Sequence, residues 1–327
     1  MGPVLGVEGG GSHAHAIVAE TSGRCLGVGT SHDSANWEDV GIEAAAGSIR
    51  VCVREAFDAA GLEPEAIAAS VFALAGVDFP VDEQRLGGIP IAFGLSEPSR
   101  VMNDAFAALR VGSDRPFGVV VIAGTGSVVA GRDPEGREFR TLGLGPVFGD
   151  FGGASEVSDA AVTAVAEAFT GFGPGTALER LLPEAAGAAS MVDFIEAAGR
   201  GRIDPSSFAP QVSRAAADGD AVACGILTRA GEALGANAAH VVRMLKMERL
   251  EFDLVLAGGL FRTGTPFLVD ALDAVVRPVA PNAVTVLLED PPVVGAALLA
   301  MELAGTPPDP PVRLELARAT RSALGLA

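Results

Sequence analysis

The chain has 327 residues and is 49% hydrophobic and 20% charged, an ordinary globular balance with enough apolar material for two hydrophobic cores. Its formal net charge is −18, and so acidic a surface disfavours nucleic acid or an anionic membrane as partner, because both attract basic patches. The apolar stretch at residues 293–304 is too short to span a bilayer and is interrupted by Glu302.

The first third of the chain alternates predicted strands and helices. Residues 4–8, 15–20 and 25–30 predict strands, and a polar turn at 21–24 joins the last two as a hairpin. Helical periodicity over 41–60 stops at Gly61, a residue type that commonly ends helices. The pattern then predicts a short helix at 64–69, a strand at 70–75, a helix at 82–88, a strand at 99–103 and a helix at 105–110.

The remainder of the chain repeats this opening pattern. The order strand, glycine turn, strand, polar turn, strand appears at 4–30 and again at 117–142, which predicts a duplicated half-fold. Residues 155–247 predict mostly helices, with breaks at 171–175 and 199–205. A strand at 252–257, a helix at 265–276, a strand at 284–288, a helix at 295–303 and a weak helix in the tail complete the chain.

The three cysteines, Cys25, Cys52 and Cys224, are far apart and in no metal-binding spacing, which predicts buried free thiols in a reducing compartment. No charged segment precedes an apolar stretch near residue 1, so the sequence predicts no signal peptide. Together these features predict a cytoplasmic protein.

Three glycine-rich turns each follow an aliphatic strand, at residues 6–12, 124–127 and 256–261. Glycine at the exit of a strand lets backbone N–H groups approach an anion that a Cβ atom would keep away. A predicted strand follows the first turn, so a hairpin turn rather than a helix N-terminus would hold the phosphates. Each turn alone is weak evidence, but two turns with Asp104 between them indicate phosphoryl transfer. The only lysine, Lys246, is remote from the turns, which argues against a Walker-type NTPase or a protein kinase.

In this order, the four stretches resemble the actin-like ATPase superfamily, which includes sugar kinases, heat-shock chaperone ATPases and actin. The resemblance covers nearly the whole chain and is most specific for the N-acetylglucosamine kinase family, which groups with the BadF/BadG/BcrA/BcrD-type ATPases. The first turn of this chain reads Gly-Val-Glu-Gly-Gly-Gly, the wording of that family. Residues 34–37 resemble the family's sugar loop, and residues 143–153 resemble the family's Gly-x-Gly-x-x-x-Gly-Asp-Glu-Gly-Ser loop. Phe151 and Gly153 replace the Glu and Ser of that last loop, which leaves the identity of the sugar open.

The resemblance implies an α/β fold of the actin-like ATPase (ribonuclease H-like) type, with two lobes that each hold a mixed β-sheet flanked by helices and with a nucleotide cleft between them. The N-terminal lobe is predicted at 1–110, with the first phosphate hairpin, the sugar loops and the catalytic Asp. The C-terminal lobe is predicted at 111–327, with the second phosphate hairpin, the adenosine motif and the helical part. ATP and Mg²⁺ are the implied cofactors, and a homodimer is the implied assembly.

Asp104 is the predicted general base, because a kinase of this type needs a carboxylate within reach of the acceptor hydroxyl; the ordinary alternative is a helix N-cap. Glu8 is implied to hold Mg²⁺ through water, and its alternative is a surface acid beside a turn. His13 and His15 share one face of a strand, but no third ligand is suggested, so the sequence predicts no zinc site.

The other implied site residues fall into two groups. Those for the phosphates and adenosine of ATP are Gly9, Gly10, Gly11, Ser12, Gly124, Thr125, Gly126, Ser127, Gly258 and Gly259. Those for the sugar are Asn36, Trp37, Gly76, Asp78, Asn103, Asp104, Thr125, Gly149 and Asp150. Outside this context Asn36 would be read as a turn residue and Gly-Thr-Gly at 124–126 as a common tight turn, and a Gly-Gly pair after a strand would be equally weak evidence.

The predicted function is ATP-dependent phosphorylation of the 6-hydroxyl of an amino sugar, with N-acetylglucosamine first and glucosamine or another hexose next. One alternative is a BadF/BcrA-like ATPase with no sugar acceptor, which drives electron transfer through a cluster bridged between subunits by paired cysteines. A second is a non-catalytic sugar sensor. The scattered cysteines disfavour the first alternative, and the intact Asp104 with both phosphate turns disfavours the second.

Overall fold

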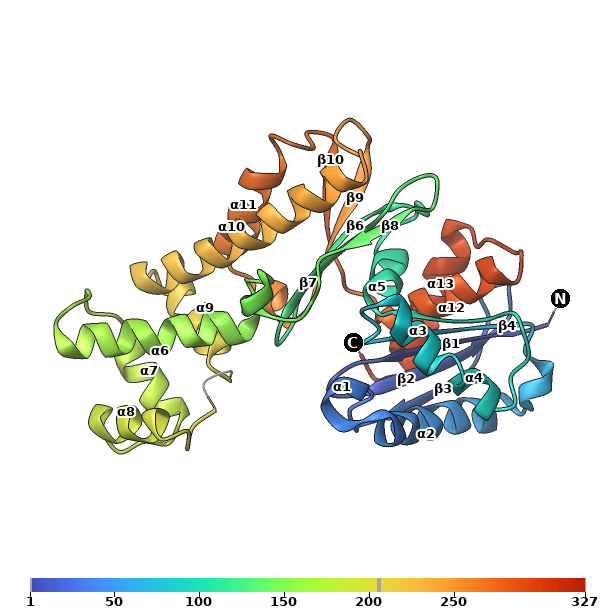
Figure 1. Cartoon of the computed structure of the whole chain (residues 1–327), viewed down its shortest axis with the longest axis horizontal. Coiled ribbons are helices and arrows are strands. Elements are labelled where there is room, and N and C mark those ends of the chain that lie inside the picture. The colour runs from blue at the N-terminus through green and yellow to red at the C-terminus, as the bar shows by residue number, and fades with distance from the viewer. Residues whose placement is uncertain (1, 205–206, 327) are drawn as a thin grey trace. The chain divides into compact units, whose positions relative to one another are not determined.

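The computed structural model of the protein describes residues 2–204 and 207–326. The chain forms two compact units, one made of residues 1–118 together with 288–327 and the other of residues 119–287 (Figure 1). The predicted division at 110/111 differs from these units mainly in its treatment of residues 288–327, which return to the first unit. The reason is packing, because the helix at Pro292–Leu303 lies on the first strand of the chain.

The first unit is built on a mixed five-stranded sheet in the order β3-β2-β1-β4-β5. Its strands are β1 (Val4–Gly9), β2 (Ala14–Ala19), β3 (Cys25–Ser31), β4 (Ala69–Leu74) and β5 (Ser99–Asn103). The first three strands pair in antiparallel fashion, whereas β1, β4 and β5 are parallel to one another. All five predicted strands of this region are confirmed within one or two residues.

Helices pack closely on this sheet, and glycines in its strands allow the approach. Helix α2 (Ile42–Ala60) covers β2 and β3, and a Cβ atom on Gly29 would lie 1.9 Å from the carbonyl oxygen of Cys52 in that helix. Helix α12 (Pro292–Leu303) packs on β1, β4 and helix α5 (Ala105–Gly112). The remaining helical segments of the unit are α1 (Trp37–Val40), η1 (Pro64–Ala66), α3 (Pro80–Leu86), α4 (Ile89–Ala92) and α13 (Pro310–Ala323).

The second unit repeats the strand arrangement of the first. Its sheet has the order β10-β9-β6-β7-β8, which matches β5-β4-β1-β2-β3 strand for strand and confirms the predicted duplication. The strands are β6 (Gly118–Ala123), β7 (Ser127–Arg132), β8 (Glu138–Arg140), β9 (Phe252–Ala257) and β10 (Ala283–Leu287).

Most of the second unit is helical, as the alanine-rich sequence predicts. Its helices are η2 (Pro146–Phe148), α6 (Ala154–Thr170), α7 (Leu178–Ala185), α8 (Met191–Gly199), α9 (Ala209–Ala217), α10 (Ala221–Met244), η4 (Gly259–Thr263) and α11 (Pro266–Val276). The predicted break at 171–175 is confirmed, because α6 ends at Gly171 in the left-handed conformation. The predicted break at 199–205 starts where α8 ends, and residue 205 lies outside the described residues. Within the described part of the chain, no helix is both long and apolar enough to cross a bilayer.

Candidate active site

Several predicted site residues lie at the carboxyl ends of the parallel strands of the first sheet. Gly9, Leu74 and Asn103 end the parallel strands β1, β4 and β5, and the register pairs Gly9 with Leu74 and Leu74 with Asn103. The turn after β1, the loop after β4 and Asp104 therefore start side by side. In sheets of this kind, ligands bind at the carboxyl ends of parallel strands.

Asp104 precedes helix α5 but does not cap it with its side chain. The capping contact comes from the neighbouring residue, since the Oδ1 atom of Asn103 accepts a hydrogen bond of 3.1 Å from the backbone N–H of Ala105. The amide group of Asn103 also donates to Oδ1 of Asp78, at 3.1 Å. Asp104 thus occupies the N-cap position of α5, as its ordinary explanation predicts, while Asn103 holds the turn in which Asp104 lies.

The first phosphate turn is fixed at its base by the two adjacent loops. The carbonyl oxygen of Gly9 accepts from the N–H of Ala75, and the carbonyl oxygen of Gly10 accepts from the N–H of Ala35. The N–H of Gly10 itself donates to the carbonyl oxygen of His13, which closes the hairpin. The turn is thus a preformed hairpin joining β1 to β2, as the sequence predicts.

Glu8 is the acidic residue of β1 and is 6% exposed. Within the described residues its Oε2 atom makes no hydrogen bond, although Nε2 of His13 and Nδ1 of His15 lie 3.8 and 3.6 Å away. A buried carboxylate needs a compensating partner, so the site fits a cation. The sequence suggested no third ligand beside the two histidines, and the structure supplies one, because Glu8 pairs directly opposite His15 across the β1–β2 ladder. The predicted hairpin could have revealed this third ligand, because cross-strand pairing places Glu8 opposite His15.

The predicted sugar loop is an ordered segment packed on the loop after β4. Asn36 caps the short helix α1, accepting from the N–H of Glu38 and donating from its amide to Asp39. The indole N–H of Trp37 donates to the carbonyl oxygen of Gly76 at 2.6 Å. Helix α1 was not predicted, since a single turn has too few residues for periodicity. Asn36, whose ordinary alternative was a turn residue, is thus a helix N-cap by its contacts within this unit.

An arginine that sequence reasoning missed lies against the same tryptophan. The guanidinium carbon of Arg85 is 4.9 Å from the centre of the Trp37 ring, and Arg85 is ion-paired with the buried Asp82 at 2.8 Å. A guanidinium group over an indole face is a favourable cation–π arrangement. The two residues are 48 positions apart, and no local sequence pattern links them.

The second phosphate turn joins β6 to β7 and is braced by helix α6. The backbone N–H groups of Ala154 and Ser155 donate to the carbonyl oxygens of Gly124 and Thr125. This contact explains Gly153, since a Cβ atom there would lie 2.6 Å from the backbone of Gly126. Gly153 stands where the family's loop has Ser because the second phosphate turn approaches the start of α6 too closely for a side chain.

The hydroxyl of Ser127 is not aimed at open solvent. Ser127 is buried, and its Oγ atom donates to the carbonyl oxygen of Phe151 at 3.1 Å. Thr125, at the tip of the same turn, is exposed. Of the two hydroxyls predicted to face the phosphates, that of Ser127 therefore supports the loop, whereas that of Thr125 is accessible to a ligand.

The loop at residues 143–153 is closed on itself by a buried carboxylate. Asp150 is 2% exposed, and its Oδ2 atom accepts a 3.0 Å hydrogen bond from the N–H of Leu144. The carbonyl oxygen of Gly149 accepts from the side-chain amide of Asn237 at 3.4 Å. Three large apolar side chains of this loop are exposed instead, namely Val147, Phe148 and Phe151.

The glycine pair after β9 has two different explanations. Gly258 has a φ of 104°, and a Cβ atom on it would lie 2.3 Å from the carbonyl oxygen of Ala123, so the fold itself requires glycine there. A Cβ atom on Gly259 meets no described atom within 4 Å.

Gly259 shares this property with the glycines of both phosphate turns. A Cβ atom on Gly124 or Gly126 also meets no described atom within 4 Å, and on Gly10 or Gly11 the nearest is 3.7 Å away. None of these five glycines has φ in the left-handed region. Packing and backbone geometry therefore do not account for glycine at these positions, whereas the close approach of a ligand to the backbone would.

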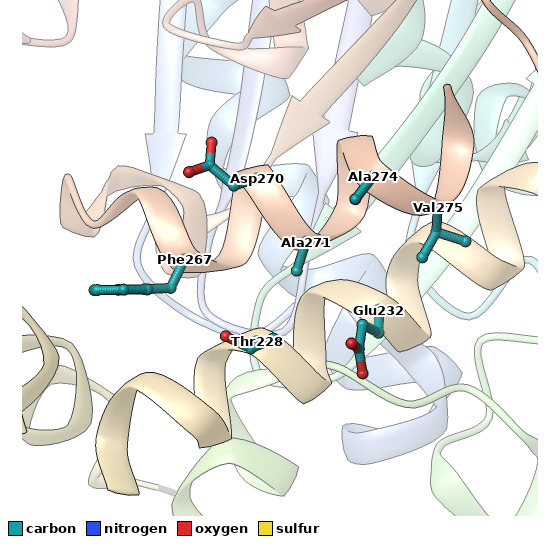
Figure 2. A pocket seen from close by; sticks show the side chains of 7 residues that line it. All are labelled: Thr228, Glu232, Phe267, Asp270, Ala271, Ala274 and Val275. Carbon is teal, nitrogen blue, oxygen red and sulfur yellow. The ribbon is translucent and has the colours of Figure 1, made fainter. Parts of the chain in front are cut away.

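The second unit also contains a cavity of about 370 Å³ on the seam between α10 and α11 (Figure 2). Its lining residues are Thr228, Glu232, Phe267, Asp270, Ala271, Ala274 and Val275. None of the predicted site residues lines it, so the cavity is separate from the candidate chemistry.

Comparison with solved structures defines the fold that these two units form. A protein from Chromobacterium violaceum provisionally described as an N-acetylglucosamine kinase superposes with a TM-score of 0.70 at 23% identity, covering 92% of this chain and 99% of that one. A ROK family glucokinase from Streptomyces griseus, solved with glucose and AMPPNP, gives 0.61 at 18% identity, covering 92% and 100%. At these identities the similarity shows the fold, which is the actin-like fold of the sugar kinases, as predicted.

Sequence comparison then identifies the family. The profile of the BadF/BadG/BcrA/BcrD ATPase family matches residues 5–300, and the chain belongs to this family. An N-acetyl-D-glucosamine kinase from Dictyostelium discoideum is 29% identical over 316 residues, which are 91% of this chain and 97% of the relative. An N-acetylmuramic acid/N-acetylglucosamine kinase from Clostridium acetobutylicum is 28% identical over 260 residues, which are 79% of this chain and 85% of the relative.

Proposed function

We propose that the protein transfers the γ-phosphoryl group of ATP to the 6-hydroxyl of an amino sugar, with N-acetylglucosamine as the leading acceptor. The observation that carries the proposal is the placement of Asp104, a carboxylate directly after β5, at the edge of the sheet where the parallel strands β1, β4 and β5 end and the first glycine turn begins. Membership of an ATPase family and two curated relatives named as N-acetylglucosamine kinases support it.

In this proposal Asp104 orients the acceptor hydroxyl and takes its proton as the phosphoryl group arrives. The N–H groups of Gly10 and Gly124 close their own turns, so the other backbone N–H groups of the turns at 9–12 and 124–127 bind the phosphates, and Gly259 lets the adenosine approach the backbone. Asn103 positions the base by holding the turn before α5. These roles use fixed dipoles, which stabilise developing charge without reorganisation.

Mg²⁺ is the metal that this reaction needs, and Glu8 is the residue that would hold it. The buried, unbonded Oε2 atom of Glu8 fits a cation at this position. The ion, when bound, would neutralise charge on the phosphates. Glu8 would hold the ion in place beside the first phosphate turn.

Asn36, Trp37, Gly76, Asp78, Gly149 and Asp150 remain the proposed sugar contacts. Trp37 and Asn103 both bond to the loop after β4, Trp37 to the carbonyl oxygen of Gly76 and Asn103 to the carboxylate of Asp78. Because Asn36 and Asp150 already make hydrogen bonds inside their own units, each would contribute to the sugar through its remaining donor or acceptor capacity. A homodimer and a cytoplasmic location are further proposals, and light scattering of the purified protein would test the first.

The alternative of an ATPase that passes electrons through a shared cluster is less well supported. A cluster ligand must be a thiolate. Cys52 is buried and Cys25 and Cys224 are partly buried, and among the described residues no cysteine belongs to a group of three or more potential metal ligands.

The experiment that tests the proposal is ATP-dependent phosphorylation of a sugar panel by wild type and Asp104→Asn. The panel contains N-acetylglucosamine, N-acetylmuramic acid, glucosamine, N-acetylmannosamine and glucose. Loss of a general base is expected to lower kcat on the preferred sugar by about 10²–10⁴-fold. The matched control is Asp58→Asn, an exposed aspartate in the same unit, which should keep wild-type turnover. ATP hydrolysis that no sugar accelerates, or equal turnover in Asp104→Asn, would refute the kinase assignment.

A further inference from the structure

Glu8, His13 and His15 form a compact cluster on the first hairpin that the kinase proposal does not use in full. One ligand atom from each side chain lies within 4.8 Å of the other two. The arrangement follows from the hairpin, in which Glu8 and His15 are paired across strands and His13 precedes β2 by one residue. The two imidazole rings are also neighbours, with centroids 4.6 Å apart and planes tilted by 50°.

The distances in this cluster suit metal ligation better than hydrogen bonding. The nearest histidine nitrogens lie 3.6 and 3.8 Å from Oε2 of Glu8, beyond the usual range of about 2.7–3.2 Å for an N–H···O bond. Ligand atoms at about 2.1 Å from a tetrahedral ion are about 3.4 Å apart. Small side-chain movements would therefore bring all three donors onto one ion.

The surroundings of the cluster fit the same interpretation. Oε2 of Glu8 is buried and makes no hydrogen bond within the described residues, which marks it as an atom that needs a partner. Nδ1 of His13 lies 2.9 Å from Oγ of Ser12. With Nδ1 as the donor of that bond, Nε2 presents its lone pair on the side of Glu8. Metal-ligating histidines commonly have such an outer hydrogen-bond partner.

The donor set specifies the class of metal. Mg²⁺ and Ca²⁺ prefer oxygen ligands, whereas imidazole suits Zn²⁺, Fe²⁺, Co²⁺ and Ni²⁺. We propose that Glu8, His13 and His15 form a binding site for a divalent first-row transition-metal ion of the zinc type. Three protein ligands leave at least one coordination position for water or another small donor. An ion at this site takes the same carboxylate that the kinase proposal gives to Mg²⁺, so the two occupancies compete.

Cobalt(II) titration of the purified, metal-free protein in excess Mg²⁺ tests this inference without ATP or sugar. The expected result is one equivalent of Co²⁺ with visible ligand-field absorption, which Zn²⁺ abolishes by displacement. His13→Ala and His15→Ala should each weaken binding by more than about tenfold, since even outer partners of a metal ligand are worth 10–100-fold. His32→Ala is the matched control, because His32 is exposed on the same unit and outside the cluster.

Every outcome of this titration bears on the site. No absorption band, binding that His32→Ala alone weakens, or equal affinity in wild type and both cluster variants would overturn it. His13 is 42% exposed, so His13→Ala should fold, and Trp37 fluorescence verifies the fold of each variant. The inference does not depend on the kinase proposal, because Co²⁺ binding and sugar phosphorylation are read out separately.

Discussion

Replacing Gly295 with alanine is expected to destabilise the first unit by about 3 kcal/mol. A Cβ atom on Gly295 would lie 1.9 Å from the carbonyl oxygen of Ala107, where ordinary contact begins at 3.4 Å, so α12 would have to move from α5 by about 1.5 Å. The helix cannot shift toward β1 instead, since Gly6 already lies so close that a Cβ atom on it would be 2.2 Å from the backbone of Ala297. Overpacking with no route to relax falls at the upper end of the usual range of about 1–3 kcal/mol.

The single tryptophan makes this prediction specific to one unit. Trp37 is the only tryptophan and the chain has no tyrosine, so intrinsic fluorescence reports on the first unit, where the indole donates to the carbonyl oxygen of Gly76. Urea unfolding followed by fluorescence should show an earlier midpoint for Gly295→Ala. The matched control is Gly47→Ala in helix α2, where a Cβ atom meets nothing within 4 Å. That variant should gain about 0.5–1 kcal/mol from helix propensity.

Two results would refute this reasoning. A Gly295→Ala transition that coincides with wild type would mean that α12 does not pack on α5 as described. If circular dichroism showed destabilisation while Trp37 fluorescence did not, residues 288–327 would belong to the second unit. Either result would remove the basis for assigning the C-terminal helices to the first unit.

Two further predictions concern the second unit. Gly259→Ala should raise KM for ATP while changing the free energy of unfolding by less than about 0.5 kcal/mol. Gly258→Ala should instead lower the melting temperature, because its Cβ would lie 2.3 Å from a backbone oxygen. Similar melting temperatures for the two variants would contradict this prediction. Burial alone would raise the pKa of Asp220, but hydrogen bonds from the N–H groups of Ala223 and Ala177 and from Thr176 outweigh it and hold the pKa below 3.8. Since the folded pKa is the lower one, Asp220 stabilises the fold above its unfolded pKa, and this contribution is lost as pH falls through the folded value. Asp220→Asn should therefore lose stability at neutral pH but little in strong acid, measured by urea unfolding under both conditions, and an equal loss under both would contradict the assignment.

Local patterns in the sequence were sufficient for the strands, the hairpins and the duplication. Residues 4–30 and 117–142 encode strand, turn and strand within short stretches, so pairing partners are neighbours in the chain. The same locality explains why Gly61 was correctly expected to end α2, where it adopts the left-handed conformation. The short helices α1 and α4 were missed because four residues cannot show helical periodicity.

The candidate site was predictable where its signal lies in consecutive residues. The glycine turns and the Asn103–Asp104 pair are such signals, and the structure brings the first turn and this pair to one sheet edge. The sequence could not reveal that the side chain of Asn103, rather than that of Asp104, accepts from the first N–H of α5, because both residue types are good caps. Nor could it show that Ser127 bonds to the loop at Phe151, 24 residues away.

Sequence alone determined the family, the two related half-folds and the class of chemistry, because these depend on local turns and their order along the chain. Only the tertiary structure decided where residues 288–327 pack and why Gly153 must be small. Each of these depends on the distance between backbones that are separated in the chain. Such distances are set by how helices and strands pack in three dimensions, and no local pattern of residue types specifies them.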